Sequence, residues 1–195
     1  MGGEGTGGVL SPATFPGAFL DRDGTINMDA GYVAKPEDLE FTPGAVEAIL
    51  TLNSHGYKVA VVTNQSGIAR GFHTEADVHA FHTEMSRQLA DSGAHIDRYY
   101  HCPHHIEGTV PPYNIECDCR KPGDAMYRRA IADLAIDPSK SIAIGDKVTD
   151  LIPAIALGAT ATLIVPKDRL ENPLPEEEPF QRVETLQLAV KRFLA

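Results

Sequence analysis

Residues 18–25 read Ala18-Phe19-Leu20-Asp21-Arg22-Asp23-Gly24-Thr25, an apolar run that stops abruptly at two carboxylates and a glycine. A short apolar run of this kind is typical of a buried strand. Similar runs recur along the chain, and segments with helical spacing separate them. The expected strands are 18–20, 58–62, 96–101, 141–145 and 161–165. Strands that alternate with helices predict an α/β fold, a Rossmann-like doubly wound parallel sheet with helices on both faces.

Five segments carry apolar residues three or four positions apart, which is the spacing of one helix face. Gly56 ends the first of them, whereas Thr74 or a neighbour caps the second, which ends at Gly93. An acidic, proline-rich loop over residues 172–179 precedes the last segment. The expected helices are 43–56, 74–93, 124–134, 146–158 and 183–194.

The chain has 195 residues, a length typical of one domain, with 43% apolar and 23% charged residues. It carries 17 basic and 27 acidic side chains, a net charge of −10, which argues against a nucleic-acid partner. We expect no membrane span, because no run of eighteen apolar residues occurs. Any phosphate that this acidic chain binds must therefore meet a local cluster of positive charge.

The glycine-rich residues 1–17 lack the basic and apolar regions of a secretory signal, and only three cysteines occur. These features predict a flexible leader over residues 1–17, one domain over residues 18–195 and a cytoplasmic, monomeric protein.

Polar motifs follow the expected strands at the edge where ligands bind in parallel α/β sheets. Asp21 and Asp23 flank one residue after the first strand, and Asp146 follows the fourth. One carboxylate of the first pair can act as a nucleophile and the other as a general acid, although Asp-x-Asp-Gly is also a common turn. With Asp146 the pair forms a hard oxygen site suited to Mg²⁺. Asp150 either supports this site or caps the next helix.

Neutral and cationic phosphate donors complete the set. Thr63 ends the second strand and offers a hydroxyl group, together with the backbone N–H groups that follow it. Arg120 and Lys121 form an adjacent basic pair just before an expected helix, a suitable pair for a phosphoryl group.

Cys102, Cys117 and Cys119 lie on a long stretch without periodicity, together with several histidines. Three thiolates and one imidazole complete a tetrahedral zinc site and leave no open position for catalysis. The chemistry alone leaves His101, His104 and His105 as candidates for the fourth ligand. Buried structural cysteines or a redox Cys-x-Cys pair are the alternatives, but neither explains the long loop.

The order and strand contexts of these four motifs resemble the haloacid dehalogenase superfamily of phosphatases, over roughly residues 18–165. The resemblance implies that Asp21 attacks phosphorus and forms an aspartyl-phosphate, and that Asp23 protonates the leaving oxygen and later activates water. It also implies that Thr63 and Lys121 hold the phosphoryl group. By the same resemblance, the carboxylate of Asp21, the backbone carbonyl of Asp23 and Asp146 bind Mg²⁺.

The cysteine loop resembles one branch of that superfamily, which contains D-glycero-D-manno-heptose 1,7-bisphosphate 7-phosphatases and histidinol-phosphate phosphatases. This resemblance selects His104 as the fourth zinc ligand, beside Cys102, Cys117 and Cys119. Gly31-Tyr32-Val33, the segment from Thr63 to Gly71 and Gly145-Asp146-Lys147 look more like the heptose enzymes. A small phosphorylated metabolite, a sugar bisphosphate, is then the expected partner. Histidinol phosphate or another small phosphometabolite is the alternative substrate.

In the heptose branch a set of loop residues would line the substrate pocket. They are Asp29, Gly31, Tyr32, Thr63, Asn64, Gln65, Ser66, Arg120 and Lys147. Ala30 replaces the histidine usual before Gly-Tyr-Val, which puts one sugar contact in doubt. The short segment between Thr25 and Thr63 leaves no room for a cap domain, so loops 26–42 and 102–119 must set specificity.

Two readings without catalysis compete with a phosphatase. A phospho-acceptor domain would use Asp21, Mg²⁺ and a lysine, but it does not need a general acid at Asp23. An interaction module built on the zinc loop would leave the carboxylates without a role. Neither accounts for all four motifs.

Overall fold

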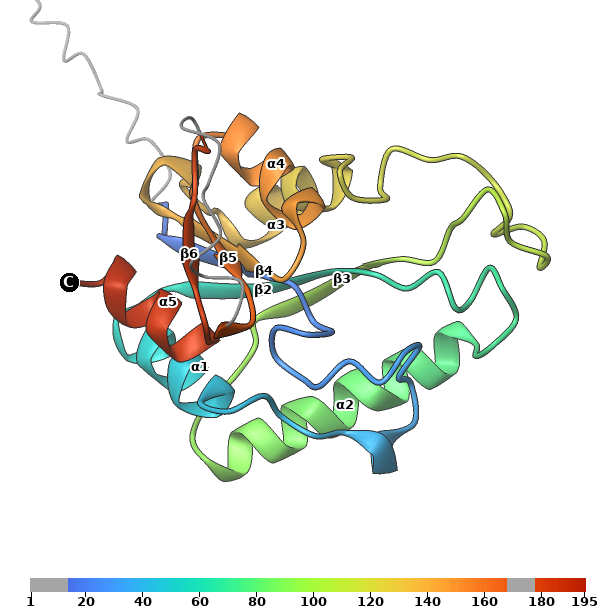
Figure 1. The fold of residues 1–195 in the computed structure, drawn as a ribbon, viewed down its shortest axis with the longest axis horizontal. Helices are drawn as coiled ribbons and strands as arrows, with labels where there is room; N and C mark the ends of the chain where they lie inside the picture. The colour runs from blue at the N-terminus through green and yellow to red at the C-terminus, as the bar shows by residue number, and fades with distance from the viewer. Residues whose placement is uncertain (1–13, 168–177) are drawn as a thin grey trace, which may run out of the picture.

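The computed structural model describes residues 14–167 and 178–195, and these form a six-stranded sheet with order β3-β2-β1-β4-β5-β6 (Figure 1). Every pair of neighbouring strands is parallel. The strands are β1 Gly17–Leu20, β2 Lys58–Asn64, β3 Arg98–Cys102, β4 Ile142–Gly145, β5 Thr160–Ile164 and β6 Gln181–Val183.

Helices cover both faces of this sheet. They are α1 Ala45–Ser54, α2 Glu75–Asp91, α3 Ala125–Leu134, α4 Val148–Ala156 and α5 Leu186–Phe193, with short 3-10 turns η1 Pro36–Asp38 and η2 Pro138–Lys140. Helices α1, α2 and α5 pack with Leu20 and Val61 on one face, whereas α3 and α4 pack with Phe19 and Val62 on the other. The expected three-layer α/β fold is therefore confirmed.

β1 lies in the middle of the sheet, and all four of its residues are buried. Phe19 pairs with Ala60 of β2 on one side and with Ala143 of β4 on the other. A strand buried on both faces reads as a continuous apolar run, which is why the short sequence 18–20 was sufficient to place it. Asp21 follows directly, and its backbone N–H still donates to the Ile144 carbonyl at 2.9 Å.

The largest difference from the sequence expectation is at the carboxyl-terminal end. The helix expected over residues 183–194 begins only at Leu186, because Gln181–Val183 pairs with β5 as a sixth strand. Thr185 caps the shorter helix by accepting the Leu188 N–H. Three residues with one buried side chain carry too little pattern to be distinguished from a helix start.

The amino-terminal boundary also differs from the expectation. Phe15 is hydrogen-bonded on both sides, to Ala135 and to Asp137, and Gly17 already belongs to β1, so the fold begins before residue 18. Residues 1–13 of the expected leader and most of the acidic segment 172–179 lie outside the described residues.

The chain reverses its direction of winding at β1, since β2 follows on one side and β4 lies on the other. This topological switch point opens a crevice at the carboxyl edge of the sheet, where ligands of such folds bind. Every residue between β1 and β2 is described, and this segment contains only η1 and α1, so no cap domain is inserted there. Among the described residues, none of the helices combines the length and apolarity that crossing a membrane requires.

Candidate active site

Lys121 is the central cation of the crevice. Its Nζ lies 2.7 Å from Asp21 Oδ1, 2.8 Å from Asp150 Oδ1 and 2.7 Å from the Val62 carbonyl oxygen. The Lys121 side chain is 1% exposed, so these contacts replace water entirely. Four sequence segments thus meet at one ammonium group: the end of β1, strand β2, the loop before α3 that carries Lys121, and the first turn of α4.

Asn64 anchors the backbone of Lys121. The Asn64 Oδ1 accepts the Lys121 N–H at 3.0 Å, and the Asn64 Nδ2 donates to the Lys121 carbonyl at 3.2 Å. This pair of bonds resembles one rung of a strand ladder, and it continues β2 sideways into the loop. Asn64 therefore positions Lys121 in addition to lining the crevice.

Burial controls the ionisation of this cluster. Burial raises the pKa of Asp21 to about 7 against the opposing effect of Lys121, and Asp150 and Asp23 add to the rise. Burial likewise raises the pKa of Asp146. Burial opposes the charge of Lys121, but Asp21, Tyr127 and Asp150 outweigh it and hold the Lys121 pKa above its ordinary value. The carboxylates are thus crowded and short of positive charge.

A divalent cation fits this shortage. Carboxylate oxygens of Asp21, Asp146 and Asp150 lie within 4.8 Å of one another. The Asp146 Oδ1 is buried and has no hydrogen-bond partner among the described residues. Hard cations such as Mg²⁺ take carboxylate and carbonyl oxygens of this kind. Gly24 is required beside them, because a Cβ there would lie 2.7 Å from Asp146 Oδ2 and its φ is +80°.

Asp23 lies on the same edge, with its carboxylate directed into a set of side-chain donors. Arg22, Asn27 and Gln65 donate four hydrogen bonds to its two oxygens, at 2.8 to 3.0 Å. Both members of the Asp-x-Asp pair line the crevice, whereas the residue between them points into the core and is fully buried.

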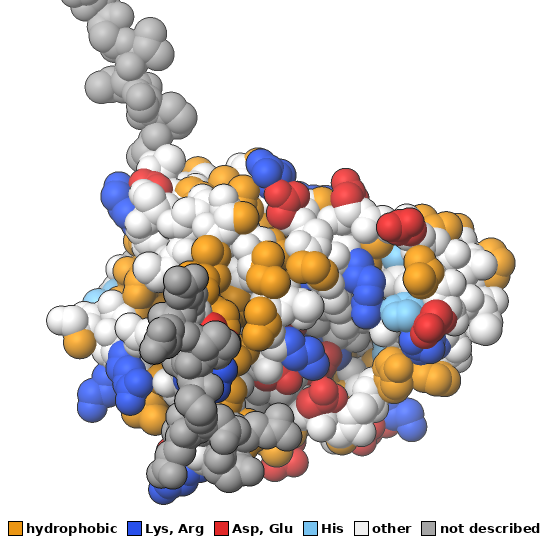
Figure 2. Space-filling model, turned by 45° about the horizontal axis from the view of Figure 1, so that its top comes forward, with side chains coloured by type: hydrophobic (Ala, Val, Ile, Leu, Met, Phe, Trp, Pro, Cys, Tyr) orange, Lys and Arg blue, Asp and Glu red, His pale blue; other side chains and the backbone are white. Residues whose placement is uncertain are grey.

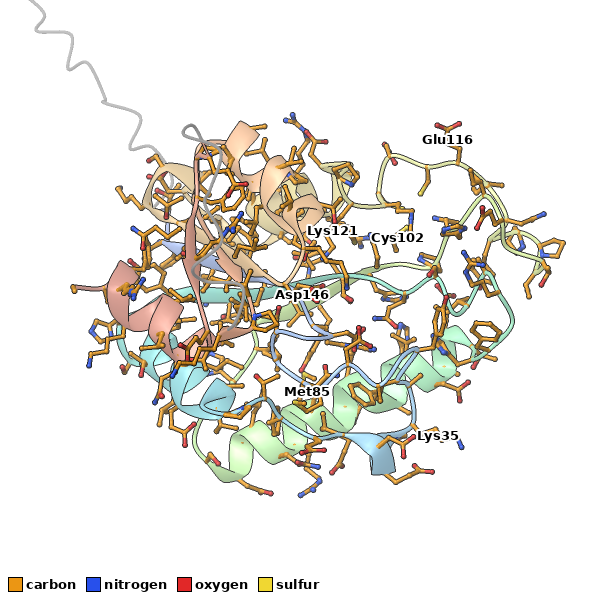
Figure 3. The ribbon with its side chains drawn as sticks, in the orientation of Figure 1. Lys35, Met85, Cys102, Glu116, Lys121 and Asp146 are labelled. Carbon is orange, nitrogen blue, oxygen red and sulfur yellow. The ribbon has the colours of Figure 1, made fainter. Side chains whose placement is uncertain are left out.

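The crevice itself is a cavity of about 410 Å³. The predicted catalytic and substrate residues line it together: Asp21, Asp23, Asp29, Gly31, Tyr32, Thr63, Asn64, Gln65, Ser66, Arg120, Lys121 and Lys147. Asp146 lies beside the cavity through its contacts with Asp21 and Lys147. Figure 3 shows Lys121 and Asp146 at the carboxyl edge of the strands, and Figure 2 shows basic and acidic side chains side by side on the face that it presents.

The outer rim of the crevice comes from the loop after β1. Tyr32 is half exposed and has a φ of +54°, which is rare for a bulky residue, and it follows Gly31 at +82°. The Tyr32 ring packs edge-on against Phe72, with ring centroids 4.6 Å apart. The Asp29 carboxylate accepts the Gly31 N–H at 2.9 Å and so stabilises this turn.

A second cluster lies beyond the crevice, on the loop between β3 and α3. The sulfur atoms of Cys102, Cys117 and Cys119 are 3.2 to 3.6 Å apart, and His104 Nδ1 lies 3.3 Å from the Cys119 sulfur. A tetrahedral zinc site with Zn–S bonds of about 2.3 Å has edges of about 3.8 Å, so the four atoms fit one.

The structure separates the histidine candidates that the sequence left open. His104 alone of the three joins the cysteines. His101 faces Glu75 at 3.5 Å, and His105 contacts Arg70 at 3.3 Å. Arg120 connects the two clusters, since it lines the crevice and its guanidinium donates to the His104 carbonyl at 3.4 Å.

Asp150 has both of the roles that the sequence offered as alternatives. It contacts Lys121 and accepts the Lys147 N–H at the start of α4, so it supports the site and caps the helix. Sequence reasoning missed two other residues of this site. Arg22 and Asn27 were not identified, although their position within four residues of Asp23 was a usable signal. A larger hollow of about 1050 Å³ along the outer side of β3 has none of the paired carboxylates, so chemistry favours the smaller crevice.

Comparison with known proteins agrees with this geometry. The model of haloacid dehalogenase-like hydrolases matches residues 16–158. D-glycero-beta-D-manno-heptose-1,7-bisphosphate 7-phosphatase of Pasteurella multocida is 47% identical over 134 residues, which are 69% of this chain and 72% of the relative. The protein of the same name from Escherichia coli is 43% identical over 164 residues, 84% of each chain.

A solved structure gives the same result in three dimensions. D,D-heptose 1,7-bisphosphate phosphatase from B. bronchiseptica, complexed with magnesium and phosphate, superposes with a TM-score of 0.78 at 32% identity. The match covers 92% of this chain and 98% of that one. The chain therefore belongs to the haloacid dehalogenase-like hydrolases and, within them, to the phosphatase family of the D-glycero-beta-D-manno-heptose-1,7-bisphosphate 7-phosphatases.

Proposed function

We propose that this phosphatase removes the 7-phosphate of D-glycero-D-manno-heptose 1,7-bisphosphate through an aspartyl-phosphate on Asp21. The observation that carries the proposal is the meeting of Asp21, Asp23 and Lys121 in one cavity whose lining includes every expected substrate residue. Sequence identity of 43% and 47% with phosphatases of that name supports the choice of substrate.

The residues divide the chemistry between them. Asp21 is the nucleophile, and the ammonium group of Lys121 at 2.7 Å holds its carboxylate and the oxygens of the incoming phosphoryl group. Thr63, which is 1% exposed at the end of β2, donates its hydroxyl to the same phosphoryl group. Uncatalysed hydrolysis of phosphate monoesters is slow enough that enzymes supply up to ~10²¹-fold acceleration, so several groups must share the work.

In the first step an Asp21 oxygen bonds to phosphorus while the bond between phosphorus and the sugar oxygen breaks. The protonated Asp23 carboxyl gives its proton to that leaving oxygen, which departs as an alcohol. In the second step the Asp23 carboxylate takes a proton from a water molecule that attacks the same phosphorus. The bond between phosphorus and Asp21 breaks, inorganic phosphate leaves, and both carboxyl groups return to their starting states.

Mg²⁺ would be held by the carboxylates of Asp21 and Asp146 and by the backbone carbonyl of Asp23, with Asp150 behind them. When bound, it neutralises negative charge on the carboxylates and on the phosphoryl oxygens, and thereby lets two anions approach each other. The orphaned Asp146 Oδ1 and the crowding around Asp21 support this assignment.

Zn²⁺ would be held by Cys102, His104, Cys117 and Cys119 as a closed structural site. Its role is to order the loop that delivers Arg120 and Lys121 to the crevice. Burial raises the pKa of the Cys102 thiol, so a cation is needed to keep that sulfur as a thiolate.

Loops 26–42 and 102–119 supply specificity because β1 and β2 are joined without a cap domain. Arg120 and Lys147 both line the crevice and offer positive charge to a second anionic group of the substrate. Ala30 is exposed beside Gly31, so the sugar loses a side-chain contact there if related enzymes use one.

The test is phosphate release with Mg²⁺ from heptose 1,7-bisphosphate, fructose 1,6-bisphosphate and histidinol phosphate, compared by kcat/KM. We expect the heptose to be preferred by about 100-fold or more, a ratio within reach of pocket contacts. Preference for histidinol phosphate would keep the mechanism and reject the substrate. Absence of release from all three would reject the phosphatase proposal.

A further inference from the structure

Arg22 lies between the two carboxylates of the Asp-x-Asp pair, yet it points away from the cavity. Its side chain is 0% exposed, and its guanidinium carbon lies 4.5 Å from the centroid of the Phe81 ring on α2. An arginine stays charged in any protein environment. A buried charge of this kind needs a compensating partner, because an unpaired one is strongly destabilising.

The ionised Asp23 carboxylate, the state that takes the proton from water in the second step, is that partner through a two-pronged contact. Arg22 Nε donates to Asp23 Oδ1 and Arg22 Nη2 donates to Asp23 Oδ2, both at 3.0 Å. Such a fork fixes the plane of a carboxylate as well as its distance, which a single lysine contact cannot do. Arg22 Nη2 also donates to the Val33 carbonyl at 2.6 Å, so the fork is itself attached to the backbone.

Two amides complete the setting of the Asp23 carboxylate. Asn27 Nδ2 donates to Oδ1 at 3.0 Å, and Gln65 Nε2 donates to Oδ2 at 2.8 Å. Gln65 also accepts from Arg22 through its Oε1 at 3.1 Å, so arginine, amide and carboxylate form a closed ring. Each Asp23 oxygen thus accepts two hydrogen bonds, and rotation of the carboxyl group would break several of them together.

His82 of α2 holds the far side of Arg22. Its Nε2 lies 3.4 Å from Arg22 Nη1, and its ring stacks on Tyr99 with centroids 4.3 Å apart and an interplanar angle of 14°. Burial, followed by the charge of Arg22, lowers the pKa of His82 to about 2, so the imidazole is neutral and its Nε2 accepts from the guanidinium. His82 has no contact with the cavity of the active site.

We propose that Arg22 is a positioning residue which sets the orientation of the Asp23 carboxyl group for proton transfer, and that His82 holds Arg22 in place from α2. This inference rests on the proposed role of Asp23 as acid and base. It extends the site from Asp23 at the cavity, through Arg22, to His82 on helix α2.

The consequence depends on the leaving group. A sugar alkoxide must be protonated as it departs, whereas p-nitrophenolate leaves without a proton. In the step that phosphorylates Asp21, a well-aligned Asp23 is therefore needed for the sugar phosphate and not for p-nitrophenyl phosphate. A misplacement of about 1 Å can cost about 10²-fold in rate. Loss of general structure would instead lower both reactions together.

The experiment compares wild type, Arg22→Lys, His82→Leu and His82→Gln. One readout is steady-state kcat and KM on the sugar phosphate, and the other is the pre-steady-state burst of p-nitrophenolate. For Arg22→Lys we expect kcat on the sugar phosphate to fall about 10²-fold at unchanged KM, with the burst rate within about 3-fold of wild type. For His82→Leu we expect kcat on the sugar phosphate to fall about 10-fold, again with the burst rate close to wild type. His82→Gln keeps a hydrogen-bond acceptor and should restore kcat on the sugar phosphate.

Met85→Leu is the matched control, because Met85 is fully buried on α2 (Figure 3), one turn beyond His82, and takes part in none of the hydrogen bonds that Arg22 makes with the described residues. It should leave the ratio of the two rates unchanged. If Arg22→Lys fails to fold, the His82 pair decides the matter alone. Equal losses in both reactions, or no rescue by His82→Gln, would overturn the proposal.

A failure of the proposed substrate is distinguishable from a failure of this inference. If the wild type does not hydrolyse heptose 1,7-bisphosphate, kcat is measured on whichever of the other alkyl phosphates it hydrolyses and is compared with the burst rate in the same way. If the wild type hydrolyses heptose 1,7-bisphosphate but the variants lose the same factor in both rates, the proposed function stands and the positioning role of Arg22 is wrong.

Discussion

The molecule holds two clusters of potential metal ligands, and they are built in opposite ways. Asp21, Asp146 and Asp150 lie at the ends of β1 and β4 and at the start of α4, on the rigid carboxyl edge of the sheet. Cys102 ends β3, but its companions His104, Cys117 and Cys119 belong to a long loop (Figure 3). The first cluster borders a cavity and has an orphaned oxygen, whereas the second closes on itself.

This difference agrees with the proposed division of roles, in which the carboxylate cluster is catalytic and the cysteine cluster is structural. A site that must place a nucleophile to within a fraction of an ångström needs the short, paired strands that hold Asp21. A site that only ties a loop can be made of the loop itself, provided that four ligands fill the coordination sphere. The largest effects on turnover should therefore come from the carboxylates, and the largest effects on loop order from the thiols.

Asp21→Asn tests the carboxylate cluster at its proposed nucleophile, where we expect the largest effect. We expect kcat to fall by about 10⁴-fold or more, because the amide is a poor nucleophile. The fold should persist, since Lys121 keeps its contact with Asp150 at 2.8 Å. Phosphate release and circular dichroism measure the two quantities. Asp124→Asn, at the partly exposed start of α3, is the control and should keep full activity; activity in Asp21→Asn would remove Asp21 as the nucleophile.

Cys119→Ser tests the other cluster. We expect protease cleavage within residues 102–122 to rise strongly and zinc content to fall, while kcat drops only by about 10-fold. The drop is limited because Asn64 holds the backbone of Lys121 from the rigid side. Glu116→Gln, at the outer part of the same loop (Figure 3), should change neither. Unchanged cleavage in Cys119→Ser would mean that the cluster does not order the loop.

The stability of the metal-free protein at different pH values tests the carboxylate cluster. Burial raises the pKa of Asp21 to about 7 in the folded state from an ordinary value of 3.8, so the folded state binds this proton more tightly than the unfolded state. Stability should therefore fall as the pH rises from about 4 to about 7. Urea unfolding with chelator present measures it. In Asp21→Asn the free energy of unfolding should change much less over this pH range. An equally steep fall in that variant would mean that another group causes the pH dependence.

Glu107→Ala should have the smallest effect. Glu107 lies on the same loop as the cysteines and its carboxylate pairs at 3.1 Å with Arg70, which lies between β2 and α2, but the Glu107 side chain is 70% exposed. Exposed ion pairs contribute about 0–1 kcal/mol, so the unfolding midpoint and loop cleavage should both stay close to wild type. If cleavage rises as much as in Cys119→Ser, surface pairing and not the cysteine cluster orders the loop.

Much of the site was readable from the sequence because its residues follow buried strands directly. Asp21, Thr63 and Asp146 each come at the end of an apolar run, and parallel strands bring such ends to one edge. The cysteines were informative for a different reason, since three thiols and a histidine on one loop are the donors of a closed zinc site. Local pattern and topology were enough for the carboxylates and the thiols, whereas the choice of His104 among three histidines needed the family resemblance.

What stayed hidden depends on side-chain contacts between distant elements. Nothing in the sequence near His82 shows that it meets Arg22, sixty positions away. The double contact of Asn64 with Lys121 is equally invisible, because it requires the loop before α3 to lie beside β2. β6 was missed because three residues carry too little periodicity, and only its pairing with β5 defines it.

The most direct test of the central claim is to trap the covalent intermediate on the wild-type enzyme. Enzyme turning over heptose 1,7-bisphosphate is quenched in acid, treated with borohydride, which reduces an acyl phosphate to an alcohol, and digested for mass spectrometry. We predict homoserine at position 21 and unmodified carboxylates at Asp23, Asp146 and Asp150. Turnover with an unmodified Asp21, or with the modification at another carboxylate, would contradict the account.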